Sequence, residues 1–438
     1  MVNRFSINID KFVLIGIGFA AIGVAVSYAD IYLFHIWFLL FGFFWLIKIK
    51  NSQYLLEFEF FFSNHFLFLI SMFVWYTISL IWTQDTILGI KYLFYIFCGL
   101  IISFIIINYS KNIERLNEIY KVLSFVFIIE IIISLLESFN LFRWPISPYS
   151  SWHTFFGKES IDYFSYDSIV FNSAFSAPTG FHWNTNNLAI TMVMILPFFL
   201  CHKKLSINLI GSICITLITI FAASRAVFLG LILIFCIYLI VIKKKIVSLL
   251  LIWFLIPGIF IGMNFLKESE NPRINEVANS LQALELYLKG DLDIGGSLEW
   301  RRELINDGID ALIKSKGLGV GAGGSTALQE KVGGVAGRFT SMHNFWVEIL
   351  VEGGILFGII GFIWYSNIIF NLFKILNSKL NTELIFLAQA LFLSMIGFIP
   401  AAVSASSTIY FFPMWIMVGM AISLILINKN SQIDKINY

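Results

Sequence analysis

A histidine and two glutamates stand close together at the start of an apolar segment near the C-terminus. The run from Ser341 to Glu348 reads SMHNFWVE, and Glu352 follows one helical turn later. Ionisable side chains are costly in a membrane and are usually kept there for function. Because a neutral imidazole accepts protons, His343 is a candidate general base. A histidine with a purely structural role is the alternative.

The residues around His343 predict the start of a helix. Ser341 has the side chain of an N-cap for a helix that begins at Met342. The positive end of its dipole would attract an anion and keep His343 neutral. Asn344, Glu348 and Glu352 are four residues apart, so we expect a polar stripe down an otherwise apolar helix.

An arginine on a predicted helix face is a candidate for binding an anion. In the amphipathic segment 298–313, Arg301 falls near the middle of the apolar face and Arg302 at its edge. A buried arginine needs an anionic partner, which would be either a structural carboxylate or a phosphate.

Two further cations lie at the ends of apolar segments. Arg225 is expected at the outer end of the turn between two spans. Lys91 is expected near the outer end of another span, and it is a weaker candidate for the same roles. Each would either snorkel to the membrane surface or serve the site. Glu130, inside a predicted span, is a candidate counter-ion for Arg225 or a helix-packing residue.

Apolar residues are too abundant for a globular protein. Of 438 residues, 58% are hydrophobic and 13% are charged, and the mean hydropathy is +0.85. About 20 apolar residues make a helix that crosses a bilayer. The chain is therefore predicted to be an all-α polytopic membrane protein. Twelve such segments occur, at residues 12–29, 31–47, 60–82, 87–108, 121–139, 184–201, 205–223, 225–242, 246–265, 343–370, 384–404 and 408–427.

The positions of Lys and Arg predict the orientation of the chain. Every second connection is basic and the short connections between them carry no Lys or Arg, so we expect both termini in the cytoplasm. The predicted divisions are helices over 1–139, an aromatic-rich outer loop over 140–183, helices over 184–266, a large outer loop over 267–342, and helices with a cytoplasmic tail over 343–438.

The outer loops contain three distinctive features. The first loop has thirteen aromatic residues, which favour either an interfacial belt or a platform for sugar rings. The second predicts amphipathic helices over 274–288 and 298–313. The glycine-rich run 317–324 lacks the Lys-Ser/Thr ending of a phosphate-binding loop, so we expect a flexible hinge, with amides facing an anion as the alternative.

Metal and nucleic-acid sites are not predicted. The net charge is only +2, and the basic residues follow the membrane topology. The cysteines lie in or at the edges of predicted spans without metal-ligand spacing, and the other histidines are scattered, so no metal and no cofactor is expected. These residues are Cys98, Cys201, Cys214, Cys236, His35, His65, His153 and His202.

Four motifs, in one order, resemble the O-antigen ligase and polysaccharide polymerase superfamily. The resemblance covers about residues 70–427 and is closest in character to teichuronic-acid and capsule polymerases. The motifs are PTGFHWNTNNLA over 178–189, the pair Ser224-Arg225, the segment from Arg301 through Gly308 to Gly319–Gly323, and His343-Asn344-x-Trp346-x-Glu348 followed by Gly353-Gly354.

The resemblance implies a GT-C-like, metal-independent, inverting glycosyltransferase. The enzyme would act at the outer face of the bacterial cytoplasmic membrane on a glycan carried by undecaprenyl diphosphate. Its acceptor would be another lipid-linked unit for a polymerase, or a lipid core sugar for a ligase. Chain-length regulator and flippase proteins are candidate partners within the lipid bilayer.

The resemblance also assigns roles to individual residues. His343 matches the essential histidine, Arg225 and Arg301 match essential arginines that bind the diphosphate, and Asn344 and Glu348 match positions that support the histidine. The further candidates for substrate binding are Lys91, His182, Trp183, Asn186 and Asn187.

The chain departs from the superfamily pattern at two places. Members often have an arginine shortly before Gly180, where this chain has Phe175, Ser176 and Ala177, and Asn-Pro-Asn where it has Asn-Thr-Asn over 184–186. The resemblance alone therefore assigns no phosphate-binding role to the aromatic loop.

Two other classes of protein fit the composition. A transporter or flippase would also have many spans, but half-repeats with broken helices near mid-membrane are expected for it, and no duplication is apparent in the sequence. A non-catalytic scaffold for polysaccharide export would have no need of His343.

Overall fold

The chain folds into a helical membrane bundle, as its composition predicts. The computed structural model describes residues 9–50, 63–158, 177–243, 297–332, 340–377, 381–405 and 410–436. Within these ranges, seven helices are long and apolar enough to cross a membrane, and three shorter apolar helices accompany them. The predicted span 246–265 and the predicted amphipathic helix 274–288 lie outside the described residues.

The described elements follow this order along the chain. The helices are α1 (Ile9–Ile22), α2 (Leu33–Lys50), α3 (Asn64–Ser79), α4 (Thr86–Tyr109), α5 (Ile113–Ser138), α7 (Thr185–Leu200), α8 (Leu205–Ala222), α9 (Arg225–Ile237), α12 (Ser297–Lys314), α13 (Gly324–Val332), α14 (Phe345–Leu376), α15 (Thr382–Ala401) and α16 (Phe412–Ile436). Short pieces are η1 (Gly23–Ala25), η3 (His153–Phe156), the π-helical η5 (Tyr238–Ile242), η7 (Ala402–Ser404) and the antiparallel strands β1 (Ser27–Tyr28) and β2 (Ile31–Tyr32).

Polar side chains set where the apolar helices begin. At each of these starts a side-chain oxygen accepts a backbone N–H of the first turn, which satisfies a group that the helix itself leaves unpaired. The residues that act in this way are Ser63, Asp85, Asn112, Asn184, Asn344 and Asn381.

The first helix is shorter than predicted. The apolar pattern predicts a span over 12–29, but α1 ends at Ile22. Gly23 follows with a φ of +54°, a left-handed conformation that stops the helix. The remaining residues form η1 and the small β-hairpin, which turns the chain back into α2.

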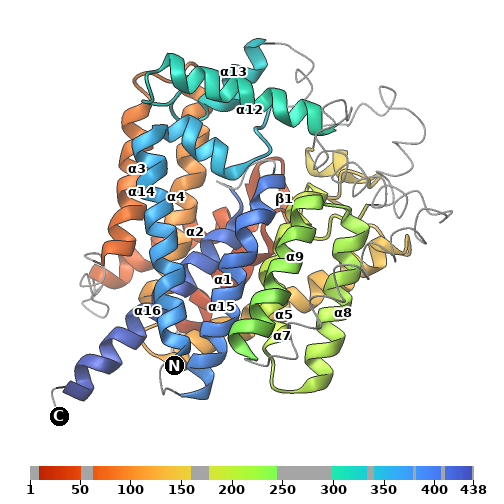
Figure 1. Cartoon of the computed structure of the whole chain (residues 1–438), viewed down its shortest axis with the longest axis vertical. Coiled ribbons are helices and arrows are strands. Elements are labelled where there is room, and N and C mark those ends of the chain that lie inside the picture. Colours follow the sequence, from red (N-terminus) through yellow and green to blue (C-terminus); the bar gives the residue numbers. More distant parts are fainter. Residues whose placement is uncertain are drawn as a thin grey trace, which may run out of the picture.

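The most buried helices form the centre of the bundle. Helix α7 is buried on all sides, and α15 and α16 are 72% buried over their most apolar windows, whereas α8 and α9 are 28% buried and lie at the edge. Figure 1 shows α12 and α13 lying across one end of the bundle, while the C-terminal part of α16 projects from the opposite end. The chemistry-bearing residues gather beneath α12.

Candidate active site

His343 lies just before α14 and not within its first turn. Its φ is +47°, which is incompatible with a helix, and its N–H donates to Ser341 Oγ at 3.3 Å. Asn344 is the N-cap, because its Oδ1 accepts the N–H of Val347 at 3.3 Å. The prediction that Ser341 caps a helix beginning at Met342 is therefore wrong. The left-handed backbone at His343 prevents the helix from starting earlier.

The surroundings of His343 favour its neutral form. Burial lowers the pKa of the imidazole to about 4, and the positive charge of Arg301 lowers it further, while a hydrogen bond with the Ser404 backbone opposes this. A pKa near 4 leaves the ring uncharged at neutral pH. A neutral imidazole can accept a proton, which is what a general base requires.

Arg301 lies close to both His343 and Arg225. Burial lowers the pKa of the Arg301 guanidinium, and the charge of Arg225 lowers it further. Arg225 is the first residue of α9, directly after the N-cap Ser224. Arg301 therefore lies within electrostatic range of both Arg225 and His343, although the three residues come from separate parts of the chain.

Packing beneath α12 holds Arg301 in place. On this helix Arg301, Leu304, Gly308 and Leu312 face inward, whereas Arg302, predicted at the edge of the apolar face, is exposed. Ile309 is 40% exposed although its side chain is apolar. Gly308 lies against the methyl end of Met342, the residue before His343, so α12 is seated directly on the loop that carries the candidate base.

A serine pair joins the other side of the site. Ser224 Oγ and Ser404 Oγ lie 3.1 Å apart, and both side chains are buried. This contact ties the start of α9 to η7, whose Ser404 backbone also bonds the imidazole. The residue pattern gave no signal for Ser404, because a single serine after a helix is common.

Two like charges held together indicate an anion site. Neighbouring guanidinium groups repel each other, and the repulsion is stronger where burial removes water. A bound diphosphate would relieve that repulsion and would accept bidentate hydrogen bonds from both groups.

Comparisons with known proteins agree with this arrangement. A family model described as O-antigen ligase matches residues 210–363, which include Arg225, Arg301 and His343. The teichuronic acid biosynthesis protein TuaE of Bacillus subtilis (strain 168) is 23% identical over 375 residues, which cover 84% of this chain and 72% of TuaE. Both comparisons support the O-antigen ligase and polysaccharide polymerase superfamily that the four motifs resemble.

The two glutamates of α14 face away from solvent. Glu348 is 1% exposed and Glu352 is 0% exposed. Ser325 donates its hydroxyl to Glu352 Oε1 at 2.6 Å, and Tyr92 donates to Glu348 Oε1 at a longer 3.5 Å. The predicted polar stripe is present and faces α4 and α13. The role of Glu348 as support for His343 stays a prediction.

Helix α14 is broken at Gly354, and the glycine-rich run fills the break. Gly354 has φ +83° and ψ 169°, which interrupts the helix. The N–H groups of Val320 and Gly321 donate to the carbonyls of Val351 and Glu352 at 2.9 and 3.1 Å, and Gly317 O accepts the N–H of Ile355 at 2.9 Å. These amides are already bonded, so the phosphate-cradle alternative is wrong for them. Close packing, and not freedom to bend, accounts for the glycines.

The packing at the break makes Gly319 hard to replace. Its φ is +92°, and a Cβ there would lie 2.5 Å from the carbonyl oxygen of Glu352. We expect Gly319→Ala to destabilise the protein by roughly 3 kcal/mol, because strain and overlap add. Thermal unfolding in detergent measures the change. Gly42→Ala is the matched control, because a Cβ at that position would have no other atom within 4 Å. Equal melting temperatures for the two variants would show that the packing of Gly319 against the broken turn of α14 does not stabilise the protein.

The candidate substrate residues of the PTGFHWN segment lie around the start of α7. His182 Nε2 is 3.0 Å from Glu130 Oε1, so Glu130 lies beside His182. Trp183 lies 5.9 Å from the ammonium group of Lys158. Asn186 donates its N–H to the capping Asn184 at 2.7 Å.

The two remaining candidates differ in their setting. Asn187 has a buried side-chain oxygen, and its carbonyl accepts the hydroxyl of Thr191 at 3.0 Å. Lys91 forms an ion pair with Asp30 at 2.9 Å, and both side chains are at least half exposed. An exposed pair of this kind contributes little stability. This ion pair places Lys91 at the surface beside the β-hairpin.

Proposed function

We propose that the chain is a metal-independent, inverting glycosyltransferase that uses a glycan on undecaprenyl diphosphate at the outer face of the bacterial cytoplasmic membrane. The family and the relative support a membrane enzyme that polymerises or ligates cell-surface glycans. The observation that carries the finer proposal is the meeting of a neutral imidazole, His343, with the guanidinium groups of Arg225 and Arg301.

The proposed reaction is a single displacement. The acceptor hydroxyl attacks the anomeric carbon of the donor glycan, and the bond from that carbon to the diphosphate oxygen breaks. The hydroxyl proton passes to His343, and the diphosphate leaves on its lipid with the bonding electrons. Attack opposite the leaving group inverts the anomeric centre. The arginines would stabilise the negative charge that grows on the leaving group.

An apolar cavity beside the site supports a lipid-linked donor. It has a volume of about 500 Å³ and is lined by side chains of α3, α14, α15 and α16, including Phe68, Phe345, Trp346 and Trp415. Phe345 and Trp346 follow His343 almost directly in the chain. Apolar surface of this kind would bury part of a polyprenyl chain while the diphosphate meets the arginines.

The acceptor separates polymerase from ligase. We favour polymerisation of repeat units of a surface polysaccharide such as an O-antigen, a capsule or teichuronic acid, because the curated relative takes part in teichuronic acid biosynthesis. Transfer to a lipid core acceptor is the alternative. The substrate-binding candidates Lys91, His182, Trp183, Asn186 and Asn187 would contact the glycans, and chain-length regulator or flippase proteins would be partners.

Reconstitution with a defined donor tests the proposed function. Purified protein in liposomes is incubated with an undecaprenyl-diphosphate-linked repeat unit, and products are separated on a gel. A ladder of longer glycans that persists in the presence of a chelator is the expected result. Product formation only with an added lipid core acceptor would indicate a ligase. Movement of the donor between leaflets without new glycosidic bonds would indicate a flippase and overturn the proposal.

Cysteine labelling tests the orientation of the site. Introduced cysteines at Ser151 and Glu330, both exposed, should react in intact cells with a membrane-impermeant reagent. Two other serines of the predicted outer loops are not used for labelling. Ser325 is 1% exposed and bonded to Glu352, and Ser165 lies outside the described residues. The four native cysteines are first replaced, and Lys204→Cys at the opposite end is the control. Protection of both outer positions would contradict the orientation.

A further inference from the structure

One face of α5 carries two buried carboxyl groups. Glu130 and Glu137 are both 0% exposed, and Ser134, also buried, lies between them. Their seven-residue separation places the two glutamates two helical turns apart on the same side. Buried carboxyl groups in a membrane helix are costly unless they are hydrogen-bonded. Both of them meet the same segment, which runs from Ala177 into α7.

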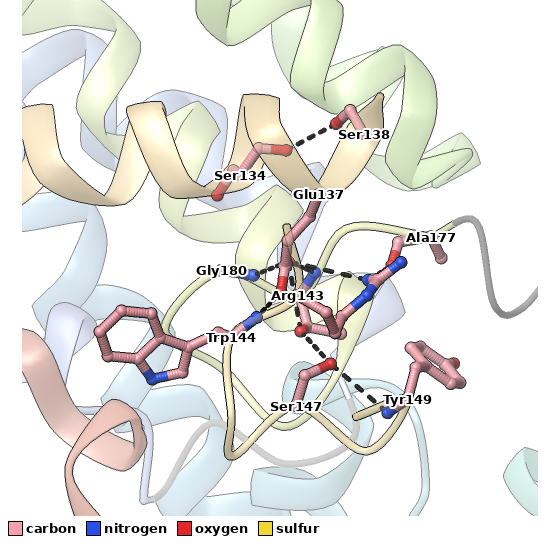
Figure 2. Close-up of polar contacts among 10 residues, drawn as sticks. Ser134, Glu137, Ser138, Arg143, Trp144, Ser147, Tyr149, Ala177 and Gly180 are labelled. Carbon is pink, nitrogen blue, oxygen red and sulfur yellow. Dashed lines mark hydrogen bonds and ion pairs between the residues drawn. The ribbon is translucent and has the colours of Figure 1, made fainter. Parts of the chain in front are cut away.

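Glu137 receives the backbone of that segment directly. Its Oε2 accepts the N–H groups of Thr179 and Gly180 at 2.6 and 2.7 Å, and its Oε1 accepts the N–H of Trp144 at 3.0 Å. Figure 2 shows the carboxyl group of Glu137 between Gly180 and Trp144. One side chain thus holds two stretches of the outer loop, one at each of its ends. Such charge-assisted bonds are stronger than bonds between neutral groups.

Arg143 and two hydroxyl groups complete the contact. The guanidinium lies 3.9 Å from Glu137 Oε2, and it donates to the carbonyl of Ala177 at 2.6 Å. Thr179 donates its hydroxyl to, or accepts from, Ser147 at 2.8 Å. Figure 2 shows Arg143 reaching from its own stretch of loop toward Ala177. The entry into α7 is therefore held on both sides of Thr179.

The second glutamate continues the contact along the segment. Glu130 lies 3.0 Å from the ring of His182, and the same ring nitrogen lies 2.9 Å from the Thr191 hydroxyl on α7. Ser134 lies so close to Gly180 that a Cβ there would be 2.6 Å from its Oγ. The backbone between Glu137 and Glu130 thus has little room to shift.

We infer that Glu137 is a positioning residue for glycan transfer, which fixes the backbone that carries Trp183, Asn186 and Asn187 at the start of α7. This inference rests on the proposed function, because the three side chains would contact the glycan. Glu137 itself lies behind the backbone and touches no reacting atom. Its loss would leave the arginines and His343 in place while the start of α7 moves.

Hydrogen exchange tests the positioning independently of any activity. Peptides over 177–187 should exchange about ten-fold faster or more in Glu137→Gln, because charge-assisted bonds to Thr179 and Gly180 are weakened. Arg143→Gln should produce a smaller increase in the exchange of the same peptides. It keeps the test possible if Glu137→Gln does not fold. The matched control is Glu114→Gln, an exposed glutamate in the first turn of the same helix. Unchanged exchange in both variants would overturn the inference.

Kinetics separate positioning from a general loss of structure. Glu137→Gln should lower kcat about ten-fold while binding of the lipid diphosphate and the melting temperature stay near the wild-type values. Glu137→Asp, which keeps the charge, should recover part of kcat. A parallel loss of donor binding and thermal stability would show a merely structural role. If wild-type protein makes no product, the proposed function fails, while the exchange result still decides whether Glu137 holds the segment.

Discussion

Replacement of His343 by alanine should abolish glycan transfer while leaving the protein folded. Loss of a general base typically lowers the rate about 10²–10⁴-fold, so chain-length ladders should collapse to single repeat units. Donor binding should persist, because the proposed diphosphate site consists of Arg225 and Arg301, which lie on other elements. The measurement combines a gel of the products with binding of undecaprenyl diphosphate to the purified variant.

The pH dependence gives a second readout for the same residue. Because the pKa of His343 is lowered to about 4, the ring stays neutral well below pH 6.5 and loses its capacity to accept a proton only as the pH falls through about 4. The acidic limb of kcat/KM, which reports the free enzyme, should therefore lie near pH 4. His65→Ala is the control for histidine removal elsewhere. Near wild-type turnover in His343→Ala would show that His343 is not the general base.

Replacement of Arg225 or Arg301 by lysine should each lower turnover about ten-fold or more. An ammonium group cannot reproduce the two parallel bonds that a guanidinium makes to phosphate, and a hydrogen bond to a charged group contributes about 1.5–3 kcal/mol. The loss should show mainly as weaker binding of undecaprenyl diphosphate, measured by titration against the purified variants.

The neighbour of Arg301 is the natural control for the arginine variants. Arg302 is exposed on the other side of α12, so Arg302→Lys should leave both binding and turnover close to the wild type. The double variant Arg225→Lys with Arg301→Lys should lose less than the sum of the single losses, because both groups would bind one diphosphate. Equal, near-normal activity in all the variants would show that these arginines only stabilise the fold.

Local patterns in the sequence determined the helical membrane fold. A run of apolar residues needs no distant partner to become a helix in lipid, because the backbone must satisfy its own hydrogen bonds there. The predicted spans therefore correspond to helices such as α4, α7 and α15, within a few residues at their ends. The exposed and buried sides of α12 followed equally from the positions of Arg301 and Arg302.

Helix ends and breaks were predicted less well, because they depend on contacts with distant residues. Ser341 and Asn344 have equally good capping side chains, and the left-handed backbone of His343 selected Asn344. The break at Gly354 is stable because the run at Gly317–Gly321 supplies backbone partners for the interrupted turn. A glycine pair alone does not reveal which other loop will fill the gap.

The sequence alone determined the chemical types at the candidate site, namely one histidine and two arginines placed at ends of apolar segments. Only the tertiary structure decided that Arg301 comes within electrostatic range of both Arg225 and His343, and that Glu130 lies beside His182. It also revealed Glu137 as the residue that holds the entry to α7. The physical reason is that side-chain chemistry is local, whereas proximity depends on how every helix packs, and packing is a property of the whole chain.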